Sequence, residues 1–216
     1  MAKNSQRIVL WRHGQTNWNI ENRFQGHSDI PLNEVGFAQA ERAAPLLLNL
    51  QPDKIVSSDL IRARQTASAL AKLAKLEIQI DAGLRETNGG KWEGKTGAEN
   101  RAEDYERFVT WLDGDDAPAG ETGERRSEIA ERAVSAITRA LSPDVSTLIV
   151  VTHGGTARCI LGKMLDMPMN QWSALGGLSN ASWSILENGH HRAGWVLVEH
   201  NAGSLPEPIY GEESGA

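Results

Sequence analysis

The chain has 216 residues, of which 40% are hydrophobic and 23% charged, as in an ordinary globular protein. This length supplies the core of one α/β domain and requires no second. The net charge is −6 at pH 7, which disfavours attraction to nucleic acid or to an anionic membrane. We therefore expect neither as a partner, and an anionic substrate would need positive charge that is concentrated locally.

The single cysteine, Cys159, cannot form an internal disulfide, and no metal-ligand spacing surrounds it. The polar N-terminal residues run directly into the short apolar stretch 8–11, which is too brief for the apolar part of a signal peptide. No run approaches the roughly 20 apolar residues of a membrane span. We therefore expect a cytoplasmic protein.

Short apolar runs alternate with helical patterns along the chain. Buried strands are predicted at residues 8–11, 55–56, 78–80 and 148–151. Helices are predicted at 34–50, from a cap at Asp59 to about 75, and along the apolar face of 129–141. This alternation predicts an α/β fold, a doubly wound, mainly parallel sheet with helices on both faces.

The predicted domain spans residues 1–200, and three segments differ in pattern from the rest of the chain. Residues 99–126 are strongly charged and predict a lid or insertion. Residues 182–187 and 192–199 alternate as strands around Asn188-Gly189, a favoured hairpin turn. Residues 201–216 are rich in Gly, Pro and Glu and predict a flexible C-terminal tail.

Four polar motifs follow predicted strands: Arg12-His13-Gly14-Gln15-Thr16, the segment from Ser57 to Ala67 that contains Arg62, Leu84-Arg85-Glu86-Thr87, and Thr152-His153-Gly154-Gly155. Ligands in such sheets bind beyond the carboxyl ends of the strands. The second and fourth motifs also open helices, whose N-terminal amides favour an anion. Taken singly, a structural histidine, a capped helix and a surface glutamate explain them equally well, but four motifs at one sheet edge favour a site.

These motifs, in this order across roughly residues 7–200, resemble those of the histidine phosphatase superfamily, the phosphoglycerate mutase-like family. The resemblance implies a three-layer sandwich and a phosphate pocket of Arg12, His13, Arg62 and His153, with Glu86 as proton donor. It also implies phosphate or substrate contacts by Asn19, Gln25, Gly26 and the amide of Gly154. The implied reaction proceeds through a phosphohistidine on His13, without a metal ion or other cofactor, on a phosphorylated small molecule. The family alone favours a homodimer.

The chemistry of a phosphomonoester agrees with these implied roles. Charge spreads over the equatorial oxygens of the transferring group, and two arginine forks hold such oxygens better than lysines. The attacking His13 must be neutral, and the cations Arg12 and Arg62 favour that form. Glu86 would protonate the leaving oxygen and then accept a proton from the attacking water.

Two features bear on the substrate. The segment 99–126 is short and acidic, whereas the mutase branch of the family carries a longer, more basic insertion, and this favours hydrolysis over transfer. Residues 172–183 resemble the same stretch in the actinobacterial glucosyl-3-phosphoglycerate phosphatases. A phosphoglycerate mutase and another small-molecule phosphatase, such as an α-ribazole phosphatase, stay open as alternatives.

Three alternatives from other functional classes also fit parts of the sequence. Residues 89–96 match the P-loop pattern of nucleoside triphosphatases, but a polar stretch stands where the required strand should precede them, and Glu93 falls inside the loop. Residues 177–181 weakly resemble the nucleophile elbow of a serine hydrolase. A binding module with a dead catalytic site is the non-enzymatic alternative, which the complete set of His13, Glu86 and His153 disfavours.

Overall fold

The sheet carries the fold of this protein, whose computed structural model describes residues 5–188 and 194–203. The strands are β1 (Arg7–Arg12), β2 (Lys54–Ser57), β3 (Ile78–Ile80), β4 (Thr147–Thr152), β5 (Trp183–Glu187) and β6 (Val196–Ala202). They form one sheet in the order β3-β2-β4-β1-β5-β6. The first four are parallel, β5 pairs antiparallel with β1, and β6 pairs antiparallel with β5. The prediction of a mainly parallel sheet is therefore confirmed.

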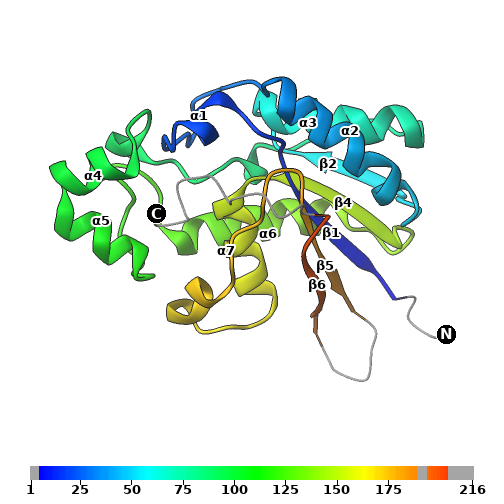
Figure 1. Ribbon diagram of the computed structural model, residues 1–216. Helices are drawn as coiled ribbons and strands as arrows, with labels where there is room; N and C mark the ends of the chain where they lie inside the picture. The colour runs from blue at the N-terminus through cyan, green and yellow to red at the C-terminus, as the bar shows by residue number, and fades with distance from the viewer. Residues whose placement is uncertain (1–4, 189–193, 204–216) are drawn as a thin grey trace.

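Helices cover both faces of this sheet (Figure 1). The α-helices are α1 (Asn17–Ile20), α2 (Glu34–Leu48), α3 (Ile61–Ala74), α4 (Gly97–Glu103), α5 (Tyr105–Leu112), α6 (Arg126–Ala140) and α7 (Gly154–Met164). Short 3-10 helices are η1 (Ala82–Leu84), η2 (Gly90–Trp92) and η3 (Met169–Ala174). Among the described residues, no helix is both long and apolar enough to cross a membrane.

Alternate side chains of the strands enter two separate cores. On β1, Val9 and Trp11 pack with α2 and α3, whereas Ile8 and Leu10 pack with α6 and α7. This is the period of two that a strand imposes on its side chains. Because both faces are covered, all six residues of β4 are buried, which explains their continuous apolar sequence.

Two local predictions were wrong. Asp59 does not cap α3, whose N-cap is Leu60 and has no side-chain cap. Instead its carboxylate accepts hydrogen bonds from Arg85 at 2.6 to 3.1 Å. The two predicted hairpin strands pair with each other as β5 and β6. Because β6 extends to Ala202, the predicted tail cannot begin at residue 201. The turn residue 189 and residues 204–216 lie outside the described residues.

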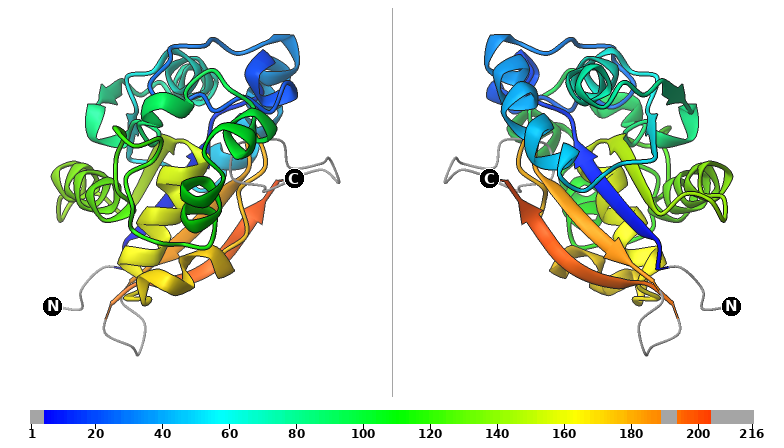
Figure 2. Two further views of the ribbon diagram at one scale, coloured as in Figure 1. Left: turned by 90° about the vertical axis from the view of Figure 1, so that its left-hand side faces the viewer. Right: turned by 90° about the vertical axis from the view of Figure 1, so that its right-hand side faces the viewer.

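The segment predicted as a lid forms a small helical cap at one end of the molecule (Figures 1 and 2). Its helices α4 and α5 pack on an aromatic cluster that includes Phe24, Trp92, Phe108 and Trp111. The guanidinium of Arg126 lies 4.3 Å from the Trp111 ring centre, a cation–π contact that joins the cap to α6. Whether this cap moves stays a prediction.

Candidate active site

Strand register brings the predicted motifs together. β1 pairs Arg12 with Thr152 of β4, and β2 pairs Ser57 with Val151. The next residues along these strands, His13, Ser58 and His153, therefore meet at the carboxyl edge of the sheet, where such folds bind ligands. The rings of His13 and His153 have their centres 5.1 Å apart.

His13 is held in the form that a nucleophile requires. It is buried, and its Nδ1 lies 2.7 Å from the carbonyl oxygen of Gly14. Because a carbonyl only accepts, Nδ1 carries the proton and the lone pair is on Nε2. Burial, followed by the charges of Arg62 and Arg12, lowers the pKa of His13 well below its ordinary value and outweighs the Gly14 hydrogen bond.

Arg62 is completely buried and fixes three parts of the site. Its Nε donates to Nδ1 of His153 at 3.2 Å, while its two terminal nitrogens donate to the carbonyls of Ser28 and Gly26, both at 2.8 Å. Since Nδ1 of His153 accepts, its Nε2 carries the proton and donates to the Ser58 hydroxyl at 2.9 Å. Burial and Arg62 keep the pKa of His153 well below its ordinary value.

Glu86 faces the N-terminus of α7, immediately beyond His153. It is buried, and its carboxylate accepts from the amides of Gly155 at 3.2 Å and Thr156 at 3.0 Å. The amide of Thr87 donates to the same group at 2.9 Å. The unpaired amides at the start of α7 therefore fix the position of the Glu86 carboxyl group.

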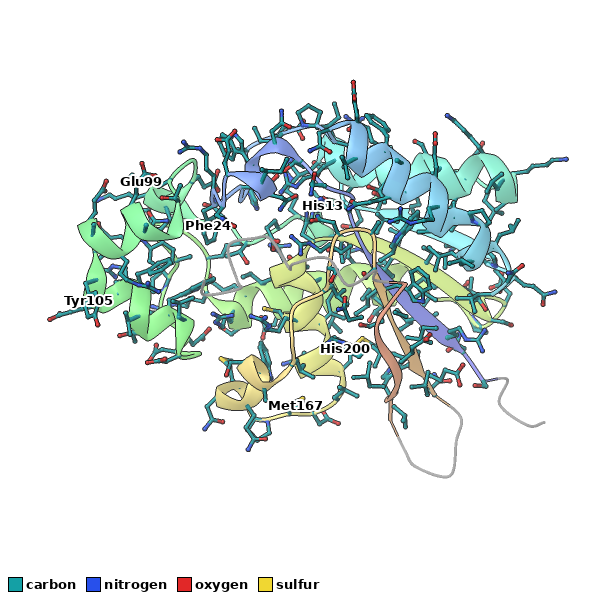
Figure 3. All side chains as sticks on the ribbon, in the orientation of Figure 1. His13, Phe24, Glu99, Tyr105, Met167 and His200 are labelled. Carbon is teal, nitrogen blue, oxygen red and sulfur yellow. The ribbon has the colours of Figure 1, made fainter. Side chains whose placement is uncertain are left out.

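The predicted substrate-contact residues lie around the same centre. The hydroxyl of Thr16 lies 3.1 Å from Oδ1 of Asn19 and 3.0 Å from Oε1 of Gln25. Gly26 follows and is held through its carbonyl by Arg62. Gly154 lies against Arg12, whose Cζ would be 3.6 Å from a Cβ at that position. All nine predicted residues are thus brought to one end of the sheet; Figure 3 shows His13 at this end and Phe24 toward the cap.

Sequence reasoning missed several residues that complete the site. Ser58 lies inside a motif that it had singled out, and Asn180 lies inside the stretch 172–183. Asn180 donates to Oδ1 of Asn19 at 3.2 Å and to the carbonyl of His13 at 3.3 Å, which connects a predicted substrate contact to the predicted nucleophile. Arg132 of α6 carries no local signal, because a charged helix residue is ordinarily solvated.

Residues 89–96 do not form a phosphate cradle. No strand leads directly into them, since η1 lies between β3 and this segment, and they contain the 3-10 helix η2. The carboxylate of Glu93 accepts from the amides of Gly89 at 3.1 Å and His27 at 2.9 Å. A side chain of the segment itself therefore binds the Gly89 amide that a phosphate would need. In the part of the chain that the structure describes, no three His, Cys, Asp or Glu residues gather as a metal site.

Comparisons with known proteins agree with this geometry. The family model described as histidine phosphatase superfamily (branch 1) matches residues 8–203. The chain is 37% identical over 200 residues to glucosyl-3-phosphoglycerate phosphatase of Mycobacterium tuberculosis, covering 88% of each chain. It is 33% identical to a probable phosphoglycerate mutase GpmB of Yersinia pestis over 194 residues, covering 88% of this chain and 90% of that one.

Solved structures match as well. A mycobacterial glucosyl-3-phosphoglycerate phosphatase with VO3 superposes with a TM-score of 0.82 and 37% identity, over 91% of this chain and 99% of that one. A putative alpha-ribazole-5'-P phosphatase from Escherichia coli gives a TM-score of 0.80 at 26% identity, over 95% of this chain and all of that one. The three-layer arrangement predicted from the sequence is the fold of these neighbours.

Proposed function

Because the chain belongs to the histidine phosphatase superfamily, we propose that it hydrolyses phosphomonoesters through a covalent phosphohistidine on His13. The observation that carries this proposal is the state of His13, whose proton is on Nδ1 and whose Nε2 keeps its lone pair. Two arginines lie close enough to lower its pKa, and the same positive charges attract a phosphate dianion. The phosphatases among the relatives support this activity.

In the first half-reaction, Nε2 of His13 attacks phosphorus and the bond from phosphorus to the ester oxygen breaks. Arg12, Arg62 and His153, with the Gly154 amide, stabilise the charge on the equatorial oxygens. The carboxyl group of Glu86 gives its proton to the leaving alkoxide. The products are a free alcohol and a phosphoramidate on His13.

In the second half-reaction, the Glu86 carboxylate takes a proton from a water molecule as its oxygen attacks phosphorus. The bond from phosphorus to Nε2 breaks, the electron pair returns to His13, and inorganic phosphate leaves. Dividing one difficult displacement into two easier ones is the advantage of covalent catalysis. No residue in this scheme calls for a metal ion or cofactor.

The proposed substrate is a small sugar or glycerate phosphate. Glucosyl-3-phosphoglycerate is the first choice because relatives that match 88% of the chain are glucosyl-3-phosphoglycerate phosphatases. Asn19, Gln25 and Gly26 would contact its phosphate end. The acidic cap favours hydrolysis over a mutase reaction, since return transfer needs a second anion to be held nearby. We propose the cytoplasm as its location and, on family resemblance alone, a homodimer.

Phosphate release in EDTA tests the proposal. Glucosyl-3-phosphoglycerate, 3-phosphoglycerate and an aryl phosphate are compared, with wild type beside His13→Ala. We expect release by wild type and none by the variant, with an acid-labile phosphoenzyme trapped by rapid quenching of wild type only. Loss of activity in EDTA, or activity that survives in the variant, would contradict the mechanism.

A further inference from the structure

One residue outside the catalytic cluster, Arg132 of α6, holds the backbone that carries Glu86. Its Nη1 donates to the carbonyls of Gly83 at 2.7 Å and Arg85 at 2.8 Å, and its Nη2 donates to the carbonyl of Glu86 at 2.9 Å. Three carbonyls within four consecutive residues thus share one guanidinium. Only a planar group with donors in a fixed fork can meet all of them at once.

Glu124 fixes Arg132 from the other side. Its carboxylate accepts from Nε of Arg132 at 2.7 Å and from Nη2 at 2.9 Å, a bidentate geometry. It also accepts from the amide of Asn88 at 2.8 Å. Burial alone would raise the pKa of Glu124, but the hydrogen bonds from Arg132 and Asn88 outweigh it and lower the pKa, so the group stays ionised.

The same pair connects Glu86 with the cap. Glu124 lies near the C-terminal end of the cap segment, and its own amide donates to the carbonyl of Asn88 at 2.9 Å. His27, which follows the phosphate-contact residues Gln25 and Gly26, has its Nε2 2.9 Å from the Glu86 carbonyl and 3.8 Å from the Glu124 carboxylate. The Glu86 carbonyl therefore receives two side-chain donors, from α6 and from the loop that Arg62 holds.

We propose that Arg132, braced by Glu124, is a positioning residue that aims the carboxyl group of Glu86 at the leaving oxygen. This inference rests on the proposed phosphatase function. Arg132 reaches Glu86 only through its backbone, so its effect is confined to the steps in which Glu86 moves a proton. An error of about 1 Å in such a group can cost roughly 100-fold in rate.

The test compares leaving groups. An alkyl ester, taken as whichever of glucosyl-3-phosphoglycerate and 3-phosphoglycerate wild type cleaves faster, needs a proton on departure, whereas 2,4-dinitrophenyl phosphate does not. We expect Arg132→Gln to lower kcat/KM for the alkyl ester roughly 10- to 100-fold and for the aryl ester by no more than about threefold. Arg132→Lys should lie between, because one ammonium cannot serve three carbonyls.

Two further variants separate positioning from a general structural role. In a Glu86→Gln background, adding Arg132→Gln should cause no further loss, since the group that it aims is already inactive. Arg139→Gln is the matched control, because Arg139 stands on the same helix and pairs with Asp81 at 2.8 Å on the exposed surface. It should leave kcat/KM unchanged for both esters.

Equal losses on the two esters, or an added loss in the Glu86→Gln background, would overturn the positioning role. If Arg132→Gln does not fold, Glu124→Gln replaces it and should show the same leaving-group selectivity to a smaller degree. Failure of Arg132→Lys and Glu124→Gln to fold as well would make the pair structural and refute the inference. A wild type without phosphatase activity, or an active His13→Ala, would instead refute the proposed function.

Discussion

Replacing Arg62 by lysine keeps the positive charge of the site and removes the guanidinium fork, so it separates geometry from charge. The fork donates to three acceptors: Nδ1 of His153 and the carbonyls of Gly26 and Ser28. A lysine ammonium at this position can satisfy one of them. The variant therefore leaves two acceptors without their donor.

The size of the effect follows from the burial of these acceptors. A buried acceptor that loses its partner costs about 1–3 kcal/mol, so two give about 2–6 kcal/mol. The bond to Ser28 is only partly buried, and water can replace it, which places the expected loss at about 2–4 kcal/mol of unfolding free energy. A domain with about 5–15 kcal/mol of stability survives this loss and can still be assayed.

Urea unfolding and steady-state kinetics on the same preparation check both consequences. With a slope of about 2 kcal/mol per molar urea, the midpoint should fall by roughly 1 to 2 M. The kcat/KM value should fall roughly 100- to 1,000-fold, as for the loss of a preorganised donor. Arg139→Lys, at an exposed ion pair, is the control and should change neither quantity. An Arg62→Lys protein with wild-type midpoint and rate would show that charge alone is sufficient and would refute the geometric role.

Other consequences can be measured independently. Since the pKa of His13 lies well below its ordinary value of 6.5, its imidazole C2–H signal in NMR, identified by its loss in His13→Ala, should titrate only well below pH 6.5; a midpoint at or above 6.5 would contradict the buried, arginine-flanked site. The same depression means that its contribution to stability is complete above pH 6.5 and declines as the pH falls towards the folded pKa, so urea midpoints should drop on the acid side more in wild type than in His13→Ala. Gly36→Ala would place a Cβ 2.1 Å from the carbonyl oxygen of Gln15 and should cost about 1–3 kcal/mol, whereas an unchanged urea midpoint would show that α2 and the His13 loop are not tightly packed. Trp111→Ala should cost about 3–5 kcal/mol because its ring is buried under Arg126, and calorimetry would show a smaller loss if the cap unfolds on its own.

The sequence alone was sufficient to predict the parts of the fold that depend on local residue patterns. β1 and β4 are continuous apolar runs with turn-forming or polar residues after them, and both faces of each are buried. The motifs that contain His13 and His153 could be placed because they directly follow those strands. Their separate roles, above all that of Glu86, came from the family resemblance, since a single glutamate in a polar segment carries no signal of its own.

Contacts between segments that are distant in the sequence could not be predicted from local sequence patterns. Asp59 is a residue type that commonly caps helices. Its carboxylate instead accepts a hydrogen bond from Arg85, which follows η1, and α3 has no side-chain cap. Arg132 stands 46 positions after Glu86 and looks like any charged residue on an amphipathic helix. Which partner such a side chain finds depends on how η1, α6 and the cap pack together, and periodicity does not contain that information.

The chain as a whole carries a net negative charge, whereas its site contains buried positive charge, and this difference has a chemical reason. The chain is acidic as a whole, yet its site buries Arg12 and Arg62, and the contacts described for both guanidinium groups include backbone carbonyls. Carbonyl dipoles hold a guanidinium without cancelling its charge, whereas a carboxylate would neutralise it. Together with burial, the charges of Arg62 and Arg12 lower the pKa of His13, which suits the proposed attack on a phosphate dianion. Burying such charge opposes folding, and a bound dianion would offset that cost, so the arrangement proposed to activate His13 also favours phosphate binding.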